Sequence, residues 1–155
     1  MKIEIYSRKA IEKLIESNFP PNTAVISFYD PPSRRTPKDY KPVDYQGKSE
    51  RLFQVGVHDI DIETLEDYGM FFDTYLPESN DLAKFVISAD RDGLDIICQC
   101  EYGQSRSAAC AAAIKEFFSH TGIEIFADYR YYPNQLIFNK LLYALKSIGE
   151  KRRED

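Results

Sequence analysis

A short polar loop between a buried strand and an alanine-rich helix limits this chain to few folds. Residues 94–98 predict the most apolar strand of the chain, and residues 107–120 predict a helix. The loop between them contains Gly103 and no large aliphatic side chain. A strand, a short loop and a helix in this order can bind an anion, because the loop amides and the helix N-terminus point at one place.

The rest of the chain alternates predicted strands with predicted helices. Strands are predicted at residues 2–6, 24–29 and 52–57, and helices at residues 7–17, 80–90 and 134–148. Ser7 and Asn80 are expected to cap two of these helices, and Gly122 and Gly149 are expected to end two others. This order predicts an α/β fold with a central, mostly parallel sheet flanked by helices.

Two segments are less regular than the others. Residues 31–49 contain four prolines and several basic side chains, and they predict a long surface loop. Residues 62–77 combine helical spacing with an aromatic cluster that Gly69 interrupts, and we interpret them as a helix.

The length and composition fit one folded domain, residues 1–149, followed by a charged tail at residues 150–155. Of the 155 residues 43% are hydrophobic, which excludes a disordered chain. The net charge of −5 disfavours broad binding to nucleic acid or to an anionic membrane. No signal-type or membrane-spanning apolar run is evident, and the three cysteines fit reduced thiols. We therefore expect a cytoplasmic protein, and we expect it to be a monomer.

Residues 100–107 place a thiol at the end of the predicted strand and a guanidinium at the start of the helix. Arg106 can grip two phosphate oxygens with its planar fork, a geometry that lysine cannot reproduce. The same positive surroundings stabilise a thiolate, so Cys100 is expected to be nucleophilic at neutral pH. Gly103 lets the backbone turn with its amides inward, and Ser107 is placed to hydrogen-bond the sulfur.

The pattern Cys100-x5-Arg106-Ser107, with Gly103 inside it, resembles the signature loop of the cysteine-dependent protein tyrosine and dual-specificity phosphatases. The small size resembles the dual-specificity branch and its compact bacterial relatives. The resemblance implies hydrolysis of phosphate monoesters through a phosphocysteine on Cys100, with Arg106 binding the phosphoryl group. It implies no metal or organic cofactor, and a phosphorylated protein or a small phosphate ester as the partner. The expected phosphate site consists of Glu101, Tyr102, Gly103, Gln104, Ser105 and Arg106.

In this family an aspartate on a separate loop protonates the leaving oxygen. Asp59 is expected to be that aspartate, because residues 52–57 resemble the strand that precedes it in the family. Asp61 and Asp73 are the alternatives. The segment between Asp59 and Cys100 is longer than in compact members of the family, so residues 68–76 would be an insertion.

Two positions depart from the pattern of the family. Gln99 stands where the family usually has a histidine, which removes one contributor to thiolate stabilisation. Glu101 places a carboxylate on the loop, and a negative rim repels highly charged substrates such as inositol polyphosphates. The alternative function is a catalytically weak phosphatase-like domain that binds phosphorylated ligands. Thiol chemistry, such as arsenate reduction or sulfur transfer, is a second alternative.

The other cysteines and the histidines also allow more than one interpretation. Cys98 is either core packing or a redox partner of Cys100, and Cys110 is expected in the core. A zinc site made of Cys98, Cys100, His58 and His120 matches no common ligand spacing.

Several residues near the predicted site remain open between a functional and a structural interpretation. His58 either tunes the neighbouring Asp59 or is a loop histidine without a role. Arg34 and Arg35 either bind an acidic or phosphorylated partner or belong to a solvated loop. Tyr102 is expected to line the pocket because it lies in the loop itself.

Overall fold

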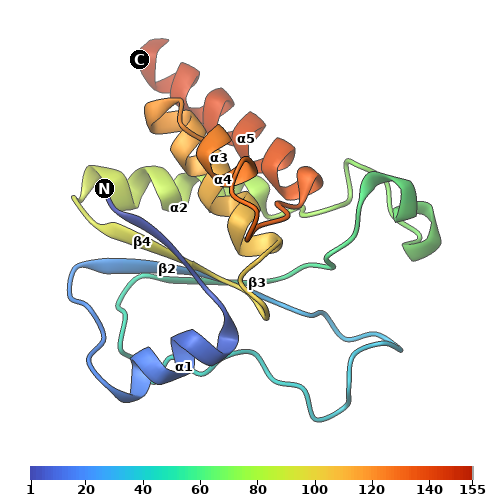
Figure 1. The fold of residues 1–155 in the computed structure, drawn as a ribbon. Helices are drawn as coiled ribbons and strands as arrows, with labels where there is room; N and C mark the ends of the chain where they lie inside the picture. Colours follow the sequence, from blue (N-terminus) through green and yellow to red (C-terminus); the bar gives the residue numbers. More distant parts are fainter. Residues whose placement is uncertain (155) are drawn as a thin grey trace.

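A four-stranded parallel sheet forms the centre of the protein, whose residues 1–154 are described by a computed structural model (Figure 1). The strands are β1 (Ile3–Tyr6), β2 (Thr23–Tyr29), β3 (Leu52–Gly56) and β4 (Asp95–Gln99). Their spatial order is β1-β4-β2-β3, so that Cys98 of β4 pairs with Ile5 on one side and with Ile26 on the other. The three pairings are parallel, which confirms the predicted α/β fold.

Helices cover both faces of this sheet. On one face lie α2 (Ser79–Arg91), α3 (Arg106–Ser119), α4 (Ile123–Phe126) and α5 (Gln135–Glu154), and on the other lies α1 (Arg8–Glu16) (Figure 1). The long loop between β2 and β3 passes over the same side as α1 (Figure 1). This arrangement gives the protein a large hydrophobic core on one face of the sheet and a smaller core on the other, and a third small cluster joins Ala108 and Ala112 of α3 to Ile125 of α4.

Alternate residues of β4 face different cores. Ile96 and Cys98 belong to the large core formed with α2, α3 and α5, whereas Ile97 packs with Ile11 and Ile15 of α1. All five side chains are at most 3% exposed, and burying one such isoleucine contributes about 1.5–3 kcal/mol. The alternation follows the two-residue period of a strand, and it explains why this segment is apolar almost throughout.

The carboxyl ends of the parallel strands meet at one edge of the sheet. Asp30 follows β2, Val57 and Asp59 follow β3, and Cys100 follows β4. Because β2 and β4 are neighbours in the sheet, side chains at their ends are brought together although they are far apart in sequence. This edge carries the candidate site.

Residues 62–77 do not form the predicted helix. They contain two short 3-10 turns, η1 (Ile62–Thr64) and η2 (Glu66–Tyr68), and Gly69 ends the second turn in a left-handed conformation. The aromatic side chains do not share one face, since Tyr75 is 1% exposed and Phe71 is 70% exposed. The segment is anchored by Tyr75, whose hydroxyl donates a 2.6 Å hydrogen bond to the carbonyl of His58.

One of the two predicted helix caps is confirmed. The Ser7 hydroxyl accepts a 3.1 Å hydrogen bond from the Ala10 amide and caps α1. The prediction for Asn80 was wrong, because α2 begins at Ser79 with Glu78 before it and Asn80 lies inside the helix.

The two glycines expected to end helices serve close packing instead. His120, with a φ of 56°, is the left-handed residue that ends α3, whereas Gly122 has a φ of −57°. A Cβ at Gly122 would lie 2.7 Å from a backbone oxygen of α3, and one at Gly149 would lie 3.0 Å from the ring of Phe117. Helix α5 therefore continues past Gly149 through Glu154.

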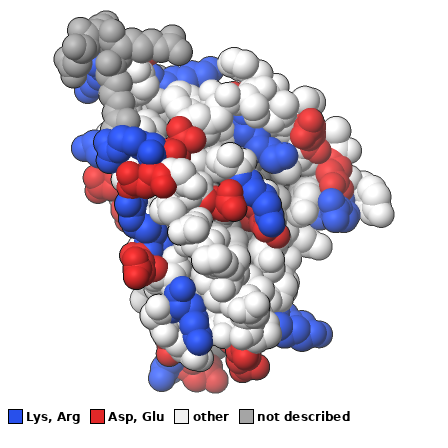
Figure 2. Space-filling model, turned by 90° about the vertical axis from the view of Figure 1, so that its left-hand side faces the viewer, with Lys and Arg blue, Asp and Glu red and all other residues white. Residues whose placement is uncertain are grey.

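The face of the molecule in Figure 2 mixes basic and acidic side chains without a large patch of one sign. Within residues 1–154, no helix is both long enough and apolar enough to cross a membrane.

Candidate active site

Strand β4 delivers Cys100 to the carboxyl edge of the sheet. Its amide donates a 3.3 Å hydrogen bond to the carbonyl of Tyr6 at the end of β1, and its side chain is only 3% exposed. The sulfur lies 3.1 Å from the hydroxyl oxygen of Ser107, which is itself fully buried in the first turn of α3. The thiol and this hydroxyl, seven positions apart, thus form the hydrogen bond that the sequence suggests.

The loop of residues 100–106, called the 100–106 loop below, packs against the junction of β1 and α1. Gly103 has a φ of 67°, a left-handed conformation that favours glycine. A Cβ there would lie 2.8 Å from the amide nitrogen of Ser7 and 3.0 Å from the carbonyl carbon of Tyr6. Both the conformation and the lack of space therefore require glycine at position 103.

The carbonyl groups of this loop are turned outward. Those of Glu101, Gln104 and Ser105 accept hydrogen bonds from the amides of Arg8, Tyr132 and Asn134, at 3.0, 2.8 and 3.1 Å respectively. Among the described residues, no backbone N–H of residues 101–106 donates to a protein acceptor. Ser105 precedes α3, but its hydroxyl does not cap the helix. The loop and the N-terminus of α3 therefore present a set of unpaired donors, which is the arrangement that binds anions.

Arg106 is 4% exposed and is held from one side. Its Nη1 donates a 2.9 Å hydrogen bond to the carbonyl of Val57 and forms a 2.7 Å ion pair with Oδ1 of Asp30. Burial acts to lower the pKa of Arg106, but the charges of Asp30, Cys100 and Asp59, with the hydrogen bond to Asp30, together outweigh burial and the pKa is raised. Its Nε is buried without a hydrogen-bond partner among the described residues. The guanidinium is thus fixed through Nη1 and keeps a donor for a ligand.

Asp59 contacts the 100–106 loop, and the competing aspartates do not. Its Oδ1 accepts hydrogen bonds from the Ser105 hydroxyl at 2.6 Å and from the side-chain amide of Asn134 at 2.9 Å. Within the described chain its Oδ2 makes no hydrogen bond. The carboxylate of Asp61 instead caps η1 by accepting from Thr64, and Asp73 lies in an exposed segment. The role of Asp59 as a proton donor stays a prediction.

The carboxylate of Glu101 is paired, so it does not place an unpaired negative charge at the edge of the loop. Its Oε1 lies 3.2 Å from Nη1 of Arg8 and accepts a 2.6 Å hydrogen bond from the hydroxyl of Tyr40. Burial and the bond to Glu101 raise the pKa of Tyr40 to about 12, so its hydroxyl stays a donor at neutral pH.

Tyr102, expected in the pocket, is 82% exposed on the outside of the loop.

Gln99 and His58 lie beside the site with partners of their own. Oε1 of Gln99 accepts hydrogen bonds from the hydroxyls of Ser27 and Tyr45, the latter at 2.6 Å, and its Nε2 is buried without a partner among the described residues. The ring of His58 packs against that of Tyr68 with 4.9 Å between centroids and 49° between the ring planes, and burial lowers the pKa of this histidine. The folded protein therefore favours the neutral form of His58.

The remaining cysteines lie in the core and not in the site. Cys98 and Cys110 are fully buried, and burial raises the pKa of Cys110 well above its ordinary value. Within residues 1–154 no group of three or more His, Cys, Asp or Glu side chains is arranged to hold a metal ion. Of the basic pair in the long loop, Arg35 lies over the ring of Tyr68 at 4.9 Å.

Sequence reasoning missed three residues that hold the site together, namely Asp30, Tyr40 and Asn134. The signal for Asp30 is present, because it is a carboxylate directly after an apolar strand. Asn134 follows a proline at the start of a predicted helix, and its Oδ1 caps α5 by accepting from the amide of Ile137 at 2.9 Å. No local pattern distinguishes Tyr40 from the other residues of its loop.

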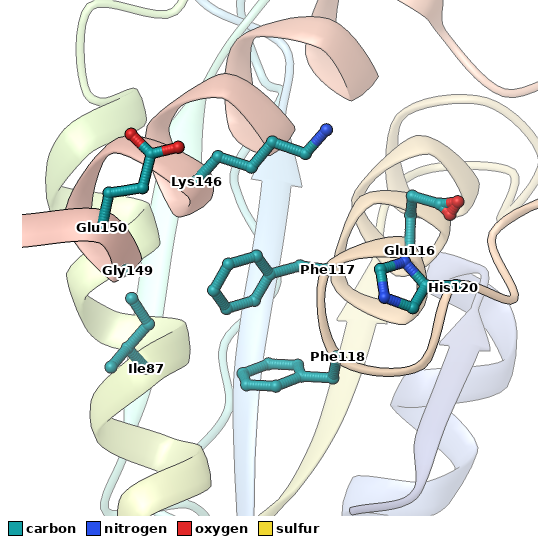
Figure 3. Close-up of a pocket in the computed structure, with 8 residues that line it drawn as sticks. All are labelled: Ile87, Glu116, Phe117, Phe118, His120, Lys146, Gly149 and Glu150. Atoms are coloured by element: carbon teal, nitrogen blue, oxygen red, sulfur yellow. The ribbon is translucent and has the colours of Figure 1, made fainter. Parts of the chain in front are cut away.

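Two pockets differ in their position relative to the predicted site residues. One of about 500 Å³ borders the 100–106 loop and is lined by Asp59, Ser105, Asn134, Phe72 and Tyr132, among others. The larger one, about 620 Å³, lies at the opposite end of α3, where Phe117 and Phe118 point toward Ile87 below side chains of α5 (Figure 3). That larger pocket contains no predicted site residue, whereas Asp59 and Ser105 line the smaller one.

Comparison with known proteins identifies the fold. No protein-family model and no curated protein matches the chain. The crystal structure of Tk-PTP in the active form matches with a TM-score of 0.54 at 9% identity, covering 95% of this chain and 92% of that one. The crystal structure of PTPMT1 matches with a TM-score of 0.51 at 13% identity, covering 99% and 96%. A structure of PTPMT1 in complex with PI(5)P matches with a TM-score of 0.50 at 12% identity, covering 97% and 94%. The fold is therefore that of the cysteine-dependent phosphatases, as the resemblance of the loop predicts.

Proposed function

We propose that the protein hydrolyses phosphate monoesters through a phosphocysteine intermediate, as a protein tyrosine or dual-specificity phosphatase. One observation carries the proposal: among the described residues, the amides of residues 101–106 and the Nε of Arg106 have no acceptor, and all of them belong to the loop that begins at Cys100. The Nε of Arg106 is buried, and a buried donor without a partner is costly in a folded protein. A phosphate group offers the oxygens that these donors lack.

The first chemical step is attack by the Cys100 thiolate on the phosphorus atom. A bond forms between sulfur and phosphorus while the bond to the leaving oxygen breaks, and Asp59 gives that oxygen its proton. Arg106 and the loop amides stabilise the charge on the other phosphate oxygens in the transition state. Ser105 and Asn134 both bind Oδ1 of Asp59, so they orient the carboxyl group and leave Oδ2 to deliver the proton.

The second step releases the phosphate. Asp59, now ionised, takes a proton from a water molecule that attacks the phosphorus atom, and the bond between sulfur and phosphorus breaks. Cys100 leaves as a thiolate, and Ser107, whose hydroxyl lies 3.1 Å from the sulfur, stabilises it by donating a hydrogen bond. The scheme uses side chains and backbone amides of this chain and requires no cofactor.

The substrates proposed are a phosphorylated protein or a small phosphate ester. Ion pairing with Arg8 offsets the charge of Glu101, so this residue is a weaker barrier to charged substrates than its sequence position suggests. PI(5)P is bound in one of the PTPMT1 structures, which supports keeping small phosphate esters within the proposal.

A catalytically weak domain that binds phosphorylated ligands is the second candidate. The observation in its favour is Gln99, a neutral residue held by Ser27 and Tyr45 where the family usually has a histidine. A neutral amide cannot add positive charge near Cys100, so a slow first step with intact phosphate binding is the signature of this candidate.

The test is phosphate release from an aryl phosphate between about pH 5 and pH 8, because the rate of an enzyme with a nucleophile and an acid depends on pH in this range. The native chain is compared with Cys100→Ser and Asp59→Asn. The proposal expects no turnover for Cys100→Ser, and for Asp59→Asn a strongly reduced rate that no longer falls at high pH. Turnover by Cys100→Ser at the native rate would refute it. An inactive native chain in which phosphate protects Cys100 from alkylation would establish the binding domain instead.

A further inference from the structure

We propose that the loop between β2 and β3, residues 30–51, is a brace that holds the 100–106 loop in its anion-binding conformation, with Asp30 and Tyr40 as positioning residues. The inference rests on the proposed function, because it concerns how the same site is kept ready. Long loops without secondary structure are uncommon in compact domains and are usually functional when they are ordered. The brace contacts both ends of the 100–106 loop: Tyr40 bonds Glu101 near its start, and Asp30 pairs with Arg106 at its end.

Asp30 holds the far end of the 100–106 loop. Its carboxylate forms the 2.7 Å ion pair with Nη1 of Arg106, a nitrogen that also donates to the carbonyl of Val57. With two acceptors on one nitrogen, the guanidinium plane cannot rotate freely, and in the part of the chain that the structure describes Nε has no partner. Asp30 is the one carboxylate among the described residues that forms an ion pair with Arg106.

Tyr40 holds the near end. Its hydroxyl donates to Oε1 of Glu101 at 2.6 Å and accepts from the amide of Asp30 at 3.1 Å. One hydroxyl therefore links the residue that fixes Arg106 to the residue that follows the nucleophile. Arg8 strengthens this junction, because its Nη1 lies within 3.2 Å of Glu101 and donates to the carbonyl of Lys41 at 2.7 Å.

The brace is itself anchored in the smaller core. Val43 and Tyr45 are 5% and 3% exposed, and the side-chain amide of Gln54 in β3 donates to the carbonyl of Val43 at 2.8 Å. The hydroxyl of Tyr45 donates to Gln99, the residue directly before Cys100. The same loop thus also fixes the position where the resembling family usually has a histidine, and it offers a reason why the site keeps its form with glutamine there.

The physical consequence is preorganisation. A loop that is already fixed loses less conformational freedom when an anion binds, so the anion binds more tightly than it does to a loose loop. Removing the Tyr40 hydroxyl loosens the 100–106 loop without changing any charge. Removing the charge of Asp30 has two opposing effects: the electrostatic repulsion of an anion falls, and Arg106 loses its orientation.

The experiment measures how tungstate, a tetrahedral oxyanion, protects Cys100 from alkylation by iodoacetamide. Tyr40→Phe is expected to weaken tungstate binding about tenfold, the loss that follows from one hydrogen bond to a charged group. Tyr143→Phe is the matched control, because Tyr143 is 75% exposed on α5, and it should bind tungstate as the native chain does.

Asp30→Asn provides a second readout through aryl phosphate kinetics. It is expected to lower kcat about tenfold or more, because orientation of a catalytic group contributes strongly to rate, while tungstate affinity changes less than kcat. Asp81→Asn, an exposed position on α2, is its control and should keep the native kcat. A merely structural role for Asp30 would not separate kcat from anion affinity.

The outcomes distinguish the two proposals. If tungstate does not protect native Cys100, the anion site of the proposed function is wrong, and the proposed role of the brace is refuted as well. If tungstate protects the native chain and Tyr40→Phe equally, and Asp30→Asn keeps its kcat, the site stands and the brace is overturned. If Tyr40→Phe fails to fold, the split between kcat and affinity in Asp30→Asn decides alone.

Discussion

Replacing Arg106 by lysine separates charge from geometry at the site. In the native chain Nη1 is engaged with Val57 and Asp30, and Nε is buried and has no hydrogen-bond partner among the described residues. Lysine offers a single nitrogen, which can pair with Asp30 or bind the phosphate but cannot do both in the geometry of the guanidinium fork. The variant keeps the positive charge and loses a preorganised donor. Loss of one such donor costs about 2.7–4 kcal/mol in the transition state, or about 10²–10³ in kcat.

The assay is steady-state hydrolysis of an aryl phosphate at saturating concentration, with thermal unfolding recorded for each variant. Arg91→Lys is the control, because the Arg91 side chain is 62% exposed at the end of α2, and it should keep the native kcat. A folded Arg106→Lys variant with kcat within about threefold of the native value would refute the reasoning, because the fork would then contribute under about 0.7 kcal/mol.

Three further predictions concern residues around the same loop. Gly103→Ala should lower the free energy of unfolding by more than about 1–2 kcal/mol, the cost of the left-handed conformation alone, because its Cβ also meets backbone atoms at 2.8 and 3.0 Å. Gly69→Ala, with the same φ of 67° and open space, should lose only the conformational part, and chemical denaturation compares the two. Ser107→Ala should slow the second step about tenfold, seen as a burst of released alcohol followed by a slower steady rate. The pKa of His58 is lowered in the folded protein, so protons bind preferentially to the unfolded chain, and its contribution to stability decreases as the pH falls through its unfolded pKa of about 6.5. His58→Gln should reduce the drop in unfolding free energy between about pH 7 and pH 5, and an unchanged drop would contradict this.

The 100–106 loop could be predicted from the sequence because the residues that define it are consecutive in the chain. A buried strand, a cysteine, a glycine and an arginine at the start of a helix follow one another, and local rules govern each of them. The strands were predictable for the same reason, since alternating burial in two cores made β2 and β4 apolar almost throughout.

The parts that were missed depend on contacts between distant segments. The glycines at 122 and 149 look like helix stops, but glycine also serves close packing, and only the neighbouring helix decides which use applies. The aromatic segment 62–77 looks helical, yet it forms irregular turns in which Tyr75 is buried and bonded to the carbonyl of His58, a contact between residues 17 positions apart. Asp30 and Tyr40 act on residues far away in sequence, so their roles depend on strand order rather than on any local pattern.

The central claim is that Cys100 forms a covalent bond to phosphorus during turnover. Acid quenching of the native protein during hydrolysis of an aryl phosphate, followed by mass spectrometry of its peptides, tests this directly. The proposed function predicts one added phosphoryl group on the peptide that contains Cys100, and its absence in Cys100→Ser. Phosphate release by the native chain without this adduct, together with undiminished release by Cys100→Ser, would contradict it.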